Sequence, residues 1–124
     1  MITKEITLCG KQVMLAYCYA TEIAFKNMCN EDMFDYVQHA VESIKQERDP
    51  DAEKTIYAIL ACMMAWYEDS EKAPVKDSEI MKDATPVEIG TAMLAILNMR
   101  SEFYHVPKDE PEDKPKEGES QKNA

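Results

Sequence analysis

The sequence predicts an α+β fold that is mostly helical, with an N-terminal β-hairpin packed on four to five helices and a disordered acidic tail at the C-terminus. Two short runs of alternating apolar and polar residues near the N-terminus are typical of a hairpin. Farther along, residues 56–67 are an apolar run, which indicates a helix that other elements must surround. Only three glycines and six prolines occur in 124 residues, so long helix-forming segments dominate.

Residues 1–107 are expected to form a single globular domain, because a chain of this length can build one hydrophobic core but not two. Residues 108–124 are dominated by Asp, Glu, Lys, Pro and Ser, and contain no aliphatic residue before the terminal alanine. A segment of this composition has no apolar surface to bury. We therefore expect a disordered charged tail.

The predicted hairpin covers residues 6–17, with its two runs separated by Gly10 and Lys11. A glycine in the first central position suits a two-residue type II′ turn. This register would gather the aliphatic side chains on one face, with Leu8 opposite Val13 and Ile6 opposite Leu15. A lone two-stranded hairpin is only marginally stable, so it must dock on helices or pair with another chain.

The next two helices are predicted from capping residues and spacing. Thr21 would cap a short helix from Glu22 to about Cys29, with Glu22 and Lys26 paired one turn apart. Asn30 would then cap an amphipathic helix that ends near residues 45–48. The apolar face of this second helix, expected to point inward, consists of Phe34, Val37, Val41 and Ile44.

The helix that contains the apolar run is predicted to begin at Asp49 and Pro50, with the aspartate as cap and the proline in the first helical position. It should end at the charged residues 68–72. A short segment around residues 78–82 is expected to follow, and it would be the fifth of the four to five helices.

The last helix has the clearest local signal in the chain. Thr85 and Glu88 have the spacing of a capping box, with Pro86 in the first turn. The helix should pack on the apolar run and end near His105, because Pro107 cannot continue it.

Charge and composition exclude several classes of protein. A net charge of -10 argues against a nucleic-acid-binding surface, which presents clustered Lys and Arg. The apolar run is too short for a membrane span, which takes about 20 residues. The N-terminus lacks the apolar segment of a signal peptide, and the four cysteines lack paired spacing. We expect a cytoplasmic protein with reduced thiols.

Catalytic chemistry has little support in the sequence. The two histidines, His39 and His105, are predicted on a solvent-facing helix face and at a helix end. A zinc site built from them with Cys29 and Cys62 would lack ligand spacing. We therefore expect a protein that is not an enzyme and holds no cofactor or metal.

Nine methionines are a more informative feature, because methionine is flexible and suits surfaces that accommodate varied apolar partners. Met63 and Met64, in the apolar run, are interpreted as core filler. Four others point inward less clearly and are the candidate partner-binding residues of a methionine-lined groove: Met14, Met33, Met81 and Met99.

The order of these elements also points to a family. A hairpin around Gly10-Lys11 is followed at once by the helix that begins Thr21-Glu22-Ile23-Ala24-Phe25-Lys26. An aliphatic and aromatic helix at residues 56–67 comes next, and Thr85-Pro86-Val87-Glu88-Ile89 starts a final helix before a charged tail. This order resembles that of phage tail assembly chaperones, which are encoded just before the tape measure protein in long-tailed phages and prophages.

The resemblance implies a non-enzymatic protein of the bacterial host cytoplasm that binds the tape measure protein and helps the tail tube protein polymerise around it. From the charge and the short apolar run we expect no nucleic-acid or membrane partner, and a free hairpin edge allows a homo-oligomer. Two alternatives remain open. One is a small acidic regulatory or inhibitory protein that acts on a DNA-binding partner, and the other is a metal-dependent enzyme.

Overall fold

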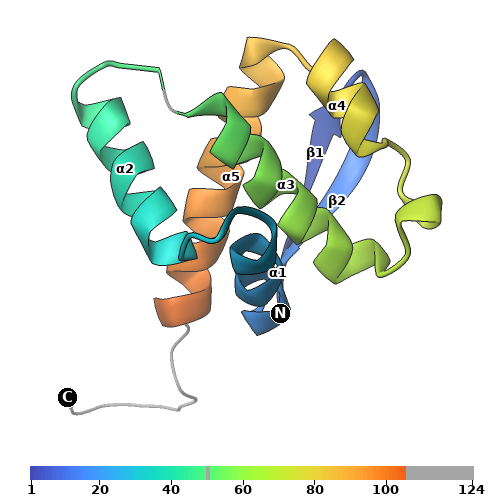
Figure 1. The fold of residues 1–124 in the computed structure, drawn as a ribbon, viewed down its shortest axis with the longest axis horizontal. Coiled ribbons are helices and arrows are strands. Elements are labelled where there is room, and N and C mark those ends of the chain that lie inside the picture. The colour runs from blue at the N-terminus through green and yellow to red at the C-terminus, as the bar shows by residue number, and fades with distance from the viewer. Residues whose placement is uncertain (50, 106–124) are drawn as a thin grey trace.

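The computed structural model describes residues 1–49 and 51–105. Within these residues the chain forms an antiparallel hairpin, five α-helices and one short 3-10 helix (Figure 1). In chain order the elements are β1 (Ile2–Leu8), β2 (Lys11–Tyr17), α1 (Tyr19–Cys29), α2 (Met33–Lys45), α3 (Ala52–Tyr67), η1 (Ser70–Lys72), α4 (Asp77–Asp83) and α5 (Pro86–His105). The predicted fold class, a mostly helical α+β protein with an N-terminal hairpin packed on helices, is confirmed.

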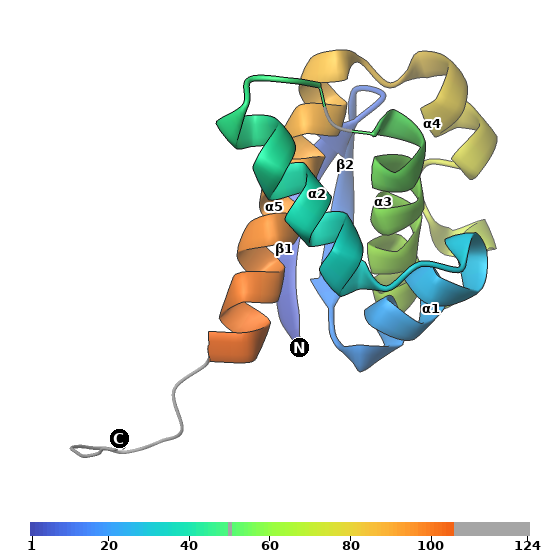
Figure 2. The ribbon, with the colours of Figure 1, turned by 60° about the vertical axis from the view of Figure 1, so that its left-hand side comes forward.

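The hairpin packs on two helices, with β2 against α3 and β1 against α5. Helix α1 packs on α3, and α3 and α5 separate α2 from the hairpin (Figures 1 and 2). One hydrophobic core joins side chains from both strands and all five of these α-helices. Its largest fully buried side chains include Tyr17, Phe25, Leu8, Leu15, Ile59, Ile80 and Ile96.

The turn of the hairpin differs from the predicted one. Its two central residues are Cys9 and Gly10, with φ of 52° and 76°, where Gly10 and Lys11 were expected. Positive φ at both positions is the type I′ arrangement, which is commoner in two-residue hairpins with glycine second. The Glu88 carboxylate, in α5, accepts hydrogen bonds from both turn N–H groups at 3.0 and 3.2 Å. A contact distant in sequence therefore supports this turn.

The register consequently shifts by two residues, so that Ile6 lies opposite Val13 and Leu8 opposite Lys11. A shift of two keeps every side chain on its expected face, because side chains alternate along a strand. The prediction that the four aliphatic residues share the core face is confirmed, although their pairing was wrong.

Helix α1 begins at Tyr19, earlier than predicted, and its N-cap is Cys18. Thr21 is not the cap: its buried hydroxyl donates to the Ala16 carbonyl at 2.8 Å and accepts the Cys18 N–H at 3.2 Å. It thereby joins the end of β2 to the first turn of the helix. Asn30, expected to cap α2, instead ends α1 in the left-handed conformation, with φ of 58°.

The charged residues of α1 also find other partners than the predicted ones. Lys26 pairs with Asp32, the N-cap of α2, at 3.0 Å. Glu22 accepts a hydrogen bond from Arg100 Nε at 3.3 Å and one each from the hydroxyls of Tyr17 and Tyr104 at 2.7 Å. The predicted pair between Glu22 and Lys26 was wrong, because each side chain has a closer tertiary partner.

Helix α2 is rotated relative to the prediction. Its buried side chains are Met33, Tyr36 and Ala40, whereas Phe34 and Ile44, expected to face inward, are exposed. The Tyr36 ring packs on Phe25 with centroids 5.6 Å apart, and its hydroxyl lies 2.8 Å from Thr55 Oγ1 in α3. These two contacts of Tyr36 fix the rotation of the helix.

Helix α3 is capped by Asp51, whose side chain accepts the Lys54 N–H at 3.1 Å, and not by Asp49 as predicted. Pro50, expected in the first helical position, lies outside the described residues. The helix ends at Tyr67, directly before the charged residues 68–72, so its predicted end is confirmed. Met64 and Trp66 are exposed, however, so α3 is not surrounded on all sides.

The last two helices lie where the sequence predicted them. Helix α4 contains the predicted residues 78–82, and α5 extends to His105, the last described residue. The capping box is present, with Thr85 N–H to Glu88 Oε1 at 3.1 Å and Glu88 N–H to Thr85 Oγ1 at 3.2 Å. The predicted disordered tail, 108–124, lies outside the described residues. Among the helices that are described, none is long and apolar enough to cross a membrane.

Candidate functional site

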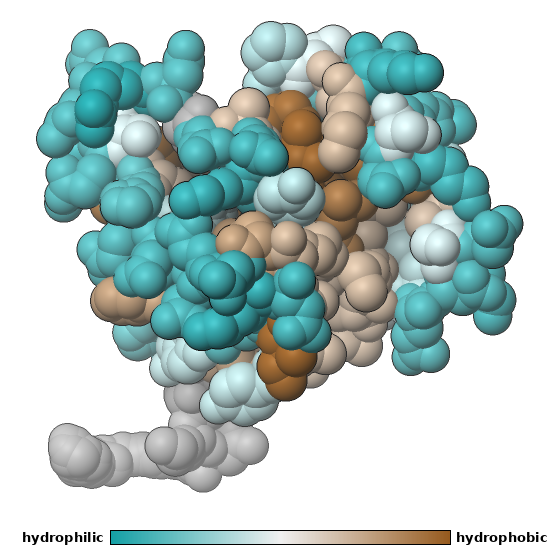
Figure 3. Space-filling model, in the orientation of Figure 1, coloured by the Kyte–Doolittle hydropathy of each residue, from teal (hydrophilic) through white to brown (hydrophobic). Residues whose placement is uncertain are grey.

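An apolar groove of about 350 Å³ lies beside the C-terminal half of α3. It is bounded by that helix, by the end of α1 and by the segment that contains η1. We call it the α3 groove, and its apolar lining is Met28, Leu60, Met63, Met64, Tyr67, Ala73 and Val75. Figure 3 shows an extended apolar area over α3, with hydrophilic side chains along its right-hand border.

The position of the groove follows from the spacing of residues in α3. Leu60, Met64 and Tyr67 recur at helical spacing and therefore share one face. Helices α1 and α5 and strand β2 pack on other faces of α3. The Met14 N–H of β2 donates to the Tyr67 hydroxyl at 3.0 Å, which holds the tyrosine ring between the hairpin and the groove.

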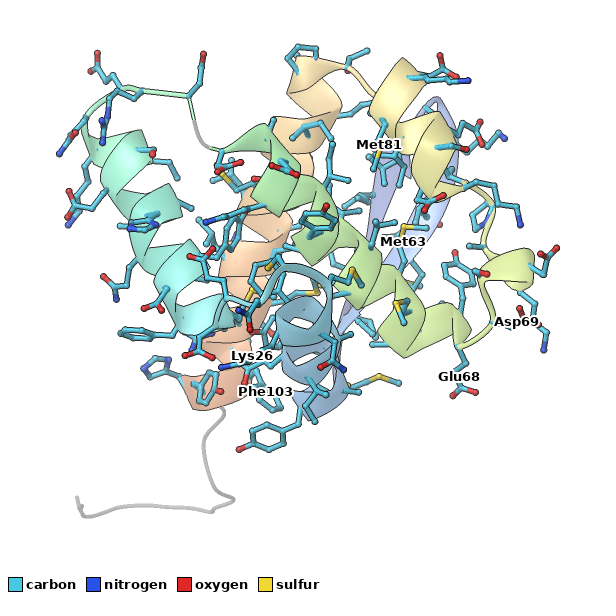
Figure 4. The ribbon with its side chains drawn as sticks, viewed as in Figure 1. Lys26, Met63, Glu68, Asp69, Met81 and Phe103 are labelled. Carbon is cyan, nitrogen blue, oxygen red and sulfur yellow. The ribbon has the colours of Figure 1, made fainter. Side chains whose placement is uncertain are left out.

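The acidic lining residues of the groove are Asp69, Glu71 and Asp77, which follow the end of α3 in the chain. Glu68 has a positive φ of 65°, which turns the chain out of the helix, and Asp69 caps η1 by accepting the Glu71 N–H at 2.9 Å. Both labelled acidic residues lie at the C-terminal end of α3 in Figure 4, beyond Met63. Lys76, a cation in the lining, lies 3.2 Å from the Ser70 carbonyl and 3.7 Å from Glu71. The carboxylates at this border favour a partner with basic residues beside its apolar face.

The four methionines predicted to bind a partner are not gathered in one groove. Met33 and Met99 are 2% and 3% exposed and belong to the core, so their predicted surface role was wrong. Met81 is 60% exposed on α4 (Figure 4), and Met14 is half-buried on β2. Each buried methionine fills space between helices, as the flexible thioether side chain does in many cores.

Three other methionines line the groove: Met28, Met63 and Met64. Met63 is buried as predicted for core filler, but Met64 is 53% exposed, which corrects that prediction. The sequence did hold a signal for this. A helix that is apolar all round needs partners on every side, and a chain of about a hundred residues provides too few elements to cover it.

The histidines and cysteines lie apart in the fold. The His39 side chain is largely exposed on α2, with Nδ1 4.0 Å from the Glu31 carboxylate, which Lys54 also contacts. His105 Nδ1 lies 2.8 Å from the Ser101 carbonyl at the end of α5. Within residues 1–49 and 51–105, no three His, Cys, Asp or Glu side chains are grouped so that they could hold a metal ion.

All four cysteines are free thiols. Cys62 is fully buried in α3, and this burial raises the pKa of its thiol strongly. Burial also raises the pKa of Cys9, with the nearby Glu79 carboxylate as a second cause, and that of Cys29. Raised values disfavour the thiolate, the form that reacts as a nucleophile.

No family model matches this sequence, and the comparisons with curated proteins and solved structures found no match.

Proposed function

We propose that this chain is a phage tail assembly chaperone, a non-enzymatic protein that binds the tape measure protein and assists polymerisation of the tail tube around it. The observation that carries the proposal is the α3 groove, an open apolar surface with three methionines in its lining. An amphipathic helix lays its apolar face into a groove of this kind. Methionine side chains can adjust to many such faces, as a chaperone of a long helical chain requires.

The charge of the chain fits the same function. A net charge of -10 keeps neighbouring copies apart when many of them coat one long polypeptide. The acidic border of the groove, at Asp69 and Glu71, would attract basic residues that flank the apolar face of a bound helix. The order of hairpin and helices, which resembles that of tail assembly chaperones, supplies the identity of the partner.

A binding experiment tests the proposal. The purified chain is mixed with the tape measure and tail tube proteins encoded beside its gene, and complexes are isolated by affinity capture. We expect capture of the tape measure protein by the unmodified chain and much weaker capture by Met64→Glu, which places a carboxylate on the exposed part of the groove. Ile23→Glu is the matched control, because Ile23 is an exposed apolar residue of α1 outside the groove.

Two results would contradict the proposal. One is that neither protein is captured by the folded, unmodified chain. The other is that the Met64 and Ile23 variants lose capture equally, since the apolar contact would then lie elsewhere.

A further inference from the structure

Two backbone groups on the outer edge of β2 make hydrogen bonds to side chains elsewhere in the fold. The Met14 N–H donates to the Tyr67 hydroxyl at 3.0 Å, and the Ala16 carbonyl accepts from the Thr21 hydroxyl at 2.8 Å. Both backbone groups therefore point away from β1. The sheet of two strands has one other edge, which belongs to β1.

The orientation of the β1 backbone follows from these contacts. Met14 lies opposite Glu5, and Ala16 lies opposite Thr3. In an antiparallel pair, hydrogen-bonded and non-hydrogen-bonded residue pairs alternate. Thr3, Glu5 and Thr7 therefore direct their N–H and C=O groups away from β2. Among the described residues, no hydrogen bond to these outward backbone groups is found.

A groove of about 550 Å³ runs along this edge, between β1 and α5. We call it the β1 groove. A smaller cavity of about 330 Å³ continues it past Thr3 and shares Lys4, Ala95 and Asn98 with it. On the helix side the groove has two exposed aliphatic residues, Val87 at 78% and Leu94 at 51%. A free strand edge beside an apolar helix flank is suited to an added strand, which would gain backbone hydrogen bonds and apolar contact together.

Charge indicates which strand would fit. Glu5 lies at the middle of the free edge, on the face of the hairpin that points away from the core, and has no ion pair among the described residues. A residue opposite Glu5 in an antiparallel strand shares this face, and a basic side chain there would pair with it. The residues on either side of this basic residue in the added strand would point toward Val87 and Leu94, where apolar side chains fit.

Two occupants from this chain itself fit less well. Residues 106–124 contain prolines at 107, 111 and 115 and no aliphatic residue after Val106 except the terminal alanine, so they make a poor hydrogen-bonding strand. A second copy paired antiparallel about the centre of β1 would place Glu5 opposite its own counterpart, between two chains that each carry a charge of -10.

We propose that the β1 groove takes up an extended segment of a partner polypeptide as a third, antiparallel strand. The segment has apolar side chains toward α5 and a basic residue opposite Glu5. Because the β1 groove shares no lining residue with the α3 groove, this inference does not depend on the proposed function.

The probe is a short peptide of alternating valine and lysine, blocked at both ends and titrated into the ¹⁵N-labelled full chain. We expect amide shifts and slower hydrogen exchange at Thr3, Glu5 and Thr7. Glu5→Gln keeps the outward N–H and removes the charge, so binding should weaken by about tenfold, which corresponds to ~1.4 kcal/mol, and its salt dependence should decrease. Glu5→Pro removes the outward N–H without removing a bond between β1 and β2, and should abolish binding.

A second variant tests the proposal if the proline variant does not fold. Leu94→Asp changes an exposed side chain of α5 and should abolish peptide binding, whereas Ile23→Asp on α1 should leave it unchanged. The same peptide with alternate backbone nitrogens methylated cannot complete the ladder and should not bind. Absence of binding to the unmodified chain, or equal binding of both peptides, would overturn the proposal. So would concentration-dependent shifts at Thr3, Glu5 and Thr7 without peptide, since the occupant would then be a second copy.

Discussion

The Glu88 carboxylate in the first turn of α5 accepts the backbone N–H of Cys9 in the hairpin turn at 3.0 Å, although the two residues lie 79 positions apart in the sequence. The same carboxylate accepts the N–H groups of Gly10 at 3.2 Å and Thr85 at 3.1 Å. One side chain thus caps a helix and closes the turn of the hairpin. The contact joins the first turn of α5 to the hairpin and supports the turn at Cys9 and Gly10.

Replacing Glu88 by Gln should lower the thermal unfolding midpoint by a few degrees at neutral pH, because a neutral amide accepts these bonds less strongly. The backbone N–H groups of Thr85, Cys9 and Gly10, in that order, hold the pKa of Glu88 below its ordinary value of 4.5. A lowered folded-state pKa gives stability that is present above the unfolded value and is lost as pH falls through the folded value.

Thermal denaturation followed by circular dichroism across acidic pH checks this prediction. The difference between the unmodified chain and Glu88→Gln should be constant near neutrality and shrink as the pH falls below 4.5. A difference that stays the same under strongly acidic conditions would show that the Glu88 charge has no part in it.

The buried hydrogen bond between Tyr36 and Thr55 should contribute measurably to stability. Its oxygens lie 2.8 Å apart, and burial raises the pKa of Tyr36 to about 12. Tyr36→Phe should lower the free energy of unfolding by about 1 kcal/mol in denaturant titrations. Tyr57→Phe is the matched control, because the Tyr57 hydroxyl makes only a long, exposed contact of 3.5 Å with Glu53. Equal losses in the two variants would refute a special role of the buried pair.

Packing around the centre of α3 should dominate stability. Ile59 is fully buried, so Ile59→Ala should cost about 2–5 kcal/mol by lost apolar burial and the cavity left behind. Ile23→Ala, on the exposed face of α1, should change the free energy of unfolding by less than about 0.5 kcal/mol. Urea titrations of both variants measure this difference, and a small effect at Ile59 would place the core elsewhere.

The Cys62 thiol should react with a disulfide reagent only when the chain unfolds. It is fully buried and its pKa is raised by that burial, whereas Cys9, Cys18 and Cys29 are half-buried. We expect the modification of Cys62, followed in a variant with the other three cysteines replaced by Ser, to accelerate with urea in step with global unfolding. Rapid modification in the absence of urea would contradict the burial of this part of α3.

Local signals in the sequence predicted much of the fold. The hairpin, the extent of the apolar run and the capping box at Thr85 each depend on neighbouring residues, and the structure contains all three. The turn of the hairpin and the rotation of α2 depend instead on distant partners. Glu88 supports the hairpin turn, and Thr55 supports the rotation of α2. Neither contact can be predicted from the spacing of residues that are close in sequence.

The candidate site was harder to predict than the fold. Met33 and Met99 differ from Met64 only in which face of their helices the neighbouring elements cover, and residue type carries no information on that. The groove exists because η1 and the segment after it pass beside α3 without covering Leu60 and Met64. Such a partial cover is a property of the assembled fold.

The most direct test is an NMR titration of the ¹⁵N- and methyl-labelled chain with a helical segment of the tape measure protein encoded beside its gene. Binding through the α3 groove predicts shifts that concentrate on the methyl groups of Leu60, Met63 and Met64, and their disappearance in Met64→Glu. Shifts confined to other surfaces, or none at saturating concentrations of the segment, would contradict the function proposed for this chain.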